Sequence, residues 1–108
     1  MRIGLINLNL KTMEIKKFKG KLIAFDFDNE IVNATDMIKH YPNKRINDFL
    51  NNQQTKDFMR VLEANINTEN PVIKSEVGRY GGTYMHKRLA YKFAAWLNPE
   101  FENFVLNQ

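Results

Sequence analysis

Residues 78–99 pass from a glycine-rich tip through an alternating segment into an amphipathic helix with a sharp end. Three glycines within residues 78–82 permit the tight turn of a hairpin, and residues 83–86 read as the strand that leaves it. The following helix ends where Asn98 can cap a further helix that has Pro99 at its first position. The inner faces of these two helices are predicted to be Leu89, Phe93 and Leu97, with Ala90 and Ala94 allowing close approach, and then Phe101, Phe104 and Val105.

The N-terminal half begins with strands. Residues 13–27 alternate between apolar and polar side chains around Lys19-Gly20, which predicts a β-hairpin with Ile23, Phe25 and Phe27 on one face. A second turn at residues 28–29 leads into a short strand at residues 30–32.

Three short helices are expected next. Asn33 can cap a helix over residues 34–40, with Asp36 returning the bond, and Pro42-Asn43 breaks it. A second helix is expected over residues 44–52 and a third over residues 55–66. Their predicted inner faces are Met37, Ile38 and Tyr41, then Ile46, Phe49 and Leu50, then Phe58, Val61, Leu62 and Ile66.

The sequence therefore predicts an α+β domain with an N-terminal antiparallel hairpin and helix-turn-helix-like helices. A second hairpin, from about Val72 to His86, would serve as the wing of a winged-helix-like fold. One core is expected to contain Trp96, Phe93, Leu89, Phe58, Leu62, Phe49, Phe101 and Phe104.

Composition narrows the functional classes. The 108 residues suit one domain, and the net charge of +4 favours an anionic partner. Cysteine is absent and there are only two histidines, so thiolate and multi-histidine metal sites are excluded, and we expect no metal or other cofactor. No apolar run has membrane-spanning length, and no signal peptide is evident, so a cytoplasmic location is expected.

The polar residues around the second short helix and the hairpin tip suit duplex DNA. Asparagine can pair with adenine and arginine or lysine with guanine in the major groove, whereas a glycine-rich tip lets the backbone approach phosphate. The candidate DNA-binding residues are Lys44, Arg45, Asn47 and Asn51 on the helix, Arg79 and Tyr80 at the tip, and Lys87 and Arg88 just beyond it. Each has a structural alternative, since such residues also form ordinary solvated faces, and Thr35 and Asp36 are better explained as capping residues than as ligand contacts.

An ordered set of short motifs resembles the KilA-N domain of phages and large DNA viruses. The motifs are Asn-Ala-Thr-Asp at residues 33–36, the basic helix at 44–50, Gly-Gly-Thr-Tyr at 81–84, the Trp-containing helix at 89–96 and Pro-Glu-Phe at 99–101. The resemblance covers about residues 14–108, and Phe49 stands where the family often has Trp. It implies DNA binding through the second short helix and the wing, because the family is also similar to the APSES domain of fungal transcription factors. The chain is expected to be a single KilA-N-like domain over residues 1–108. Such domains often begin longer phage proteins, which leaves open that the chain is the N-terminal part of one.

Two other functions are compatible with parts of the sequence. The strand that ends in Asp26 and Asp28 resembles the nucleophile motif of haloacid-dehalogenase-type phosphohydrolases, but Asn29-Glu30 follows instead of Gly-Thr, and the chain is short for that fold. We therefore expect no enzyme. The alternative to a DNA-binding phage regulator is a protein-interaction module of the same fold, such as an inhibitor of a host factor, with a homodimer or another protein as partner.

Overall fold

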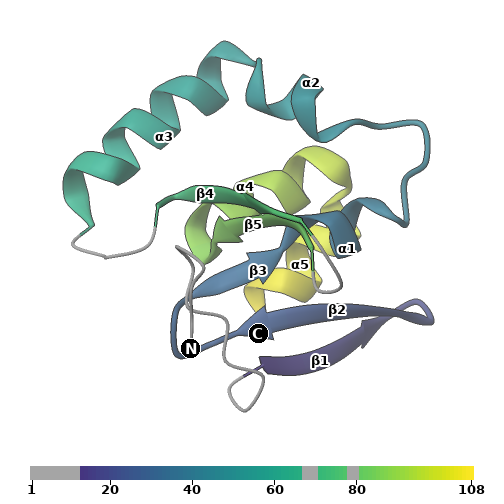
Figure 1. Ribbon diagram of the computed structural model, residues 1–108. Coiled ribbons are helices and arrows are strands. Elements are labelled where there is room, and N and C mark those ends of the chain that lie inside the picture. Colours follow the sequence, from purple (N-terminus) through teal and green to yellow (C-terminus); the bar gives the residue numbers. More distant parts are fainter. Residues whose placement is uncertain (1–12, 67–70, 78–80) are drawn as a thin grey trace.

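The computed structural model describes residues 13–66, 71–77 and 81–108, and within them the chain is α+β, with five strands and five helices (Figure 1). The strands are β1 (Met13–Phe18), β2 (Lys21–Asp26), β3 (Ile31–Asn33), β4 (Ile73–Glu76) and β5 (Gly82–His86). The helices are α1 (Ala34–Ile38), α2 (Ile46–Leu50), α3 (Gln53–Asn65), α4 (Lys87–Leu97) and α5 (Pro99–Leu106).

All five strands form one antiparallel sheet in the order β1-β2-β3-β5-β4. The β1–β2 hairpin turns at Lys19-Gly20, where both residues have positive φ angles of 50° and 84°, and this confirms the predicted N-terminal hairpin. The second predicted hairpin is confirmed as β4–β5, but β5 also pairs with β3 on its other side. That hairpin is therefore the edge of the main sheet, and the winged-helix arrangement stays a prediction.

One hydrophobic core lies between the helices and one face of the sheet. Ile23, Phe25, Val32 and Met85 point from the sheet into it, and Phe93 and Phe101 fill it from α4 and α5. All eight residues expected to share a core belong to it, five buried and three (Phe58, Trp96 and Phe104) partly buried. The opposite face of the sheet carries a smaller cluster of Ile31 and Tyr84, with Met13 against it.

Two residues outside that set of eight, each predicted to lie on an apolar face, are exposed instead. Phe27 follows the end of β2, so it leaves the alternation of the strand; its ring is 38 % exposed and stacks on Phe25 with centroids 5.4 Å apart. Val61 is 57 % exposed because α3 packs through Phe58 and Leu62, and Val61 lies about 100° around the helix from Leu62.

The helix starts follow the asparagine caps. Asn33 Oδ1 accepts the Asp36 N–H at 3.1 Å, and Asn98 Oδ1 accepts the Glu100 N–H at 2.7 Å, as predicted. Asn52 caps α3 through the Gln54 N–H at 2.8 Å, so α3 begins two residues before its predicted start. The two short helices α1 and α2 cover fewer residues than predicted, because extended Arg45 delays α2 until Ile46, and α1 ends at Ile38. Within the described ranges, no helix is long and apolar enough to cross a membrane.

Candidate nucleic-acid interface

Lys44 is held against the end of α4. Its Nζ lies 4.6 Å from the centroid of the Trp96 ring and donates a hydrogen bond to the Trp96 carbonyl oxygen at 3.3 Å. The Trp96 ring in turn packs on Phe49 of α2, with centroids 5.6 Å apart. The lysine charge therefore stands at the junction of α2 and α4, where a cation over an indole face is favourable.

The other predicted residues of the second helix are exposed. Arg45 is the N-cap residue of α2 and makes no capping bond with its side chain. Asn47 and Asn51 are four residues apart, and the Asn51 N–H donates to the Asn47 carbonyl oxygen at 2.9 Å, so their side chains lie along one face of α2. Buried Phe49 fixes which face of this short helix turns inward, leaving the two amides toward solvent.

The predicted tip residues Arg79 and Tyr80 lie outside the described residues. The last described pair of the hairpin is Glu76 with Gly82, so both tip residues belong to the connection between these two positions. Their predicted contacts with DNA stay predictions.

Lys87 and Arg88 open α4, and both are exposed. Lys87 is paired: its Nζ lies 3.2 Å from Glu30 Oε2, and its backbone N–H donates to the Glu30 carbonyl oxygen at 2.8 Å. The hydrogen bond from Lys87 holds the pKa of the Glu30 carboxyl below its ordinary value. Within residues 13–66, 71–77 and 81–108, the guanidinium of Arg88 makes no ion pair, so its charge is the more available of the two.

His86 begins this turn of α4 as its N-cap. It is 4 % exposed, and its Nδ1 accepts the Arg88 N–H at 3.1 Å, which leaves the proton of the neutral ring on Nε2, facing Glu30 Oε1 at 3.5 Å. Burial lowers the pKa of His86, and the nearby Glu30 opposes that effect. The ring is therefore a structural cap that fixes where Lys87 and Arg88 stand.

The two predicted basic groups stand at opposite ends of α4. Lys87 is its first residue, and Lys44 is anchored at Trp96, nine residues later, which corresponds to roughly 13 Å along the helix axis. Lys92 lies between them and was missed by the sequence analysis. Arg88, Lys92 and Trp96 are spaced four residues apart, so they share one stripe of the helix. We name Lys44, Arg88 and Lys92 the basic ridge.

The spacing of Lys92 from Arg88 was a signal that sequence reasoning could have used. Both residues are exposed, and Lys92 Nζ lies 5.1 Å from the centroid of the Phe58 ring, which ties this part of the ridge to α3. A pocket between α2, α3 and α4 lies beside the ridge and is lined by Phe49, Phe58 and Trp96.

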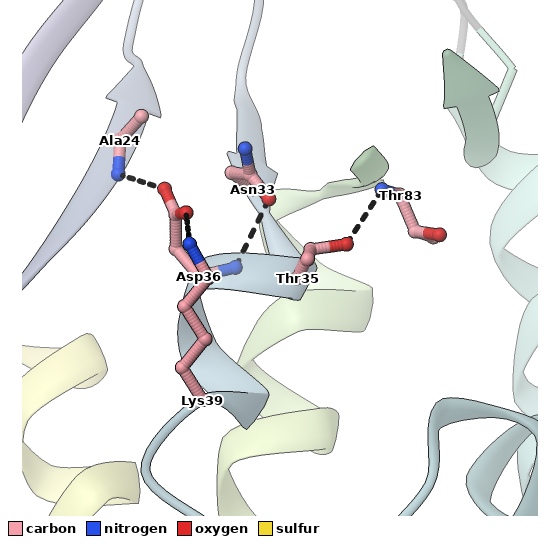
Figure 2. Close-up of polar contacts among 6 residues, drawn as sticks. All are labelled: Ala24, Asn33, Thr35, Asp36, Lys39 and Thr83. Carbon is pink, nitrogen blue, oxygen red and sulfur yellow. Dashed lines mark hydrogen bonds and ion pairs between the residues drawn. The ribbon is translucent and has the colours of Figure 1, made fainter. Parts of the chain in front are cut away.

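The Asn-Ala-Thr-Asp motif joins α1 to the strands β2 and β5 (Figure 2). Thr35 Oγ1 accepts the Thr83 N–H of β5 at 2.9 Å, and Asp36 Oδ2 accepts the Ala24 N–H of β2 at 3.0 Å. The other Asp36 oxygen lies 3.4 Å from Lys39 Nζ. The predicted capping role of Asn33 is confirmed, whereas the Asp36 carboxylate bonds the adjacent strand, so the motif fixes α1 to the sheet.

Gly82 completes this junction. Its φ of 141° is unfavourable for other residues, and a β-carbon there would lie 3.1 Å from Thr35 Oγ1 and 3.2 Å from Asn33 Oδ1. The Gly-Gly-Thr-Tyr and Asn-Ala-Thr-Asp motifs therefore meet in space, and glycine is favoured at position 82 because the α1 cap packs directly against the start of β5.

The described residues contain no group of three or more His, Asp or Glu side chains that could hold a metal ion. The exposed polar groups instead make up a surface of cations and amides, carried on helices that a five-stranded sheet supports.

The fold is that of a small α+β domain in which the Asn-Ala-Thr-Asp and Gly-Gly-Thr-Tyr motifs meet. Residues 16–108 match the KilA-N domain, and the protein belongs to that family, a family of DNA-binding-type domains. No curated protein and no solved structure matches the chain.

Proposed function

We propose that the protein binds duplex DNA through α2 and the basic ridge. The observation that carries the proposal is the alignment of Arg88 and Lys92 on one stripe of α4, with Lys44 at its end beside the exposed amides of α2. Cations spaced by helical turns along one ridge suit a row of phosphates, which supply most of the affinity in such complexes. Membership of the KilA-N family supports the same partner.

Base reading is assigned to Asn47 and Asn51. Both side chains face solvent from one side of α2, and an asparagine amide can form a bidentate pair with adenine in the major groove. Arg45, exposed at the start of the same helix, would contact phosphate or guanine. Arg79 and Tyr80 would add a contact with the DNA phosphates from the segment between β4 and β5.

The role that we propose for such a domain is in a phage-encoded regulator of transcription, acting in the cytoplasm of its host and without an enzymatic step. The resemblance of the sequence to phage and viral domains supports this role. We propose no cofactor.

The salt dependence of binding to random duplex tests the proposal. If about four phosphates are neutralised, the logarithm of the association constant should fall against the logarithm of salt concentration with a slope of roughly −3 to −4. Replacing Arg88 and Lys92 together with glutamine should make the slope less steep by about 2 and weaken binding to all sequences alike. The matched control is Lys56→Gln, which removes an exposed cation of α3 and should leave the slope unchanged.

Asn47→Ala separates readout from phosphate binding. It should blur any base preference in a selection from random duplexes while leaving the salt slope near that of the unchanged protein. Absence of binding to duplex DNA at low salt would contradict the proposal, and an unchanged slope in the Arg88 and Lys92 double variant would remove the basic ridge from it.

A protein-interaction module is the second candidate function. The specific observation in its favour is an apolar groove with exposed Phe27 and Leu106 on the side of α4 that faces α5, because exposed apolar surface of this kind marks interaction sites.

A further inference from the structure

A groove of about 500 Å³ lies among the β2–β3 connection, α3, α4 and α5. Its lining includes Phe25 and Val32, which are both nearly fully buried, and Phe27 and Leu106, which are 38 % and 62 % exposed. The volume suits one or two large side chains. Covering the apolar lining of the groove would be favourable, because it removes apolar surface from water. We name it the α4–α5 groove.

The acidic side chains that line the groove have partners within the chain, whereas two of its basic side chains form no ion pair with a described residue. The Glu30 carboxylate is paired with Lys87, and the Asp26 carboxylate is 1 % exposed and accepts the Asn29 side-chain amide at 2.8 Å. Arg88 and Lys92 also line the groove, and no described carboxylate forms an ion pair with either. The rim therefore presents two available positive charges beside an apolar floor.

We propose that the α4–α5 groove binds a short segment of a partner protein in which a large apolar side chain stands next to an acidic residue. The apolar side chain would enter between Phe27 and Leu106, and the acid would pair with Arg88 and Lys92. An apolar anchor in a pocket with charged groups at the rim is the usual composition of a protein interface. The groove shares Arg88 and Lys92 with the basic ridge. Its apolar lining offers nothing to a duplex, so binding of such a segment does not depend on whether the domain binds DNA.

Charge complementarity decides between possible occupants. Residues 1–12 of the chain carry two basic residues and no acidic one, so they do not complement a cationic rim. A second copy of the chain carries a net charge of +4, which opposes close association of two copies. A segment that carries an acid satisfies both the floor and the rim.

The test is a selection of random twelve-residue displayed peptides on the full chain, with removal of those that also bind a Leu106→Glu variant. Enriched peptides should share an aromatic or large aliphatic residue beside Asp or Glu. In titrations of one synthesised peptide, Arg88→Gln and Lys92→Gln should each weaken binding by roughly two- to fivefold, as for exposed ion pairs. Lys56→Gln, an exposed cation that does not line the groove, is the control and should leave the affinity unchanged.

Amide chemical shifts of the unchanged protein provide a readout that does not depend on a variant's folding. Addition of the peptide should move the signals of residues 31–32 and 87–92 and leave those of β1 in place. Enrichment of neutral or basic peptides, no enrichment at all, or shifts confined to other surfaces would overturn the proposal.

Two further outcomes would assign the groove to another occupant and so refute the proposal. One is a concentration-dependent dimer in sedimentation velocity that Leu106→Glu dissociates. The other is broadening of the groove signals by a spin label at Leu5→Cys, which is site-specific because the chain has no cysteine of its own.

Discussion

Substituting Gly82 with alanine should destabilise the fold far more than the same change at Gly20. Both glycines have positive φ, but a β-carbon at Gly20 would meet nothing within 4 Å, whereas at Gly82 it would press on Thr35 and Asn33 at 3.1 to 3.3 Å. Holding a residue other than glycine at such a positive φ costs about 1–3 kcal/mol. At Gly82 the added β-carbon would also disturb the Asn33 cap of α1, which is worth about 1 kcal/mol, and displace Thr35. We therefore expect Gly82→Ala to lower the free energy of unfolding by about 2–4 kcal/mol in all.

Urea unfolding followed by circular dichroism measures both changes. A value for Gly82→Ala no larger than that for Gly20→Ala would refute the reasoning, because the packing of the α1 cap against β5 is expected to make the change at Gly82 the more costly one. A double-mutant cycle sharpens the test. Thr35→Ala removes the acceptor of the Thr83 N–H and one of the crowded atoms, so Gly82→Ala should cost less in that background than in the unchanged chain.

Three other predictions can be checked with the same protein. Phe93→Ala should lower the free energy of unfolding by about 3–5 kcal/mol, because the ring is fully buried; a loss under about 1 kcal/mol in urea unfolding would contradict the core described. Burial lowers the pKa of both His40 and His86 below the ordinary value of 6.5. As the pH falls, the unfolded chain therefore binds protons before the folded chain does. The stability that this difference contributes is fully present above pH 6.5 and should be lost as the pH drops below 6.5. The urea midpoint should therefore be lower at pH 5.5 than at 7.5, and glutamine at both positions should reduce that difference; an unchanged midpoint in the original chain would be the contrary result. Lys44→Met should shift the fluorescence emission of Trp96 by removing the ammonium over its ring, and an emission spectrum identical to that of the unchanged chain would contradict the contact.

Local signals were sufficient for most of the elements. Alternation around Lys19-Gly20 and the asparagine caps before α1 and α5 predicted those elements because each depends on residues close in sequence. Strand order was not accessible in the same way. Pairing of β3 with β5 joins segments some fifty residues apart, and no local pattern specifies that the second hairpin continues the main sheet.

The surface was harder to predict than the core. The exposure of Val61 follows from which stripe of α3 packs on α4, and that choice is made by tertiary contacts such as Lys92 over Phe58. The position of Lys44 at Trp96 depends on a contact across 52 residues, so sequence reasoning identified the cation but not its attachment to α4.

Recognition of the family and the proposed binding chemistry depend on different residues. The motifs that identify the domain, Asn33 to Asp36 and Gly81 to Tyr84, hold α1, β2 and β5 together through buried or half-buried bonds, so changes there should reduce stability and affect binding only through folding. Arg88 and Lys92 make few contacts within the described residues, so changes there should alter binding with little effect on stability. Two proteins with equally good motifs can therefore differ in partner, and the side chains along α4 are the place to look for that difference.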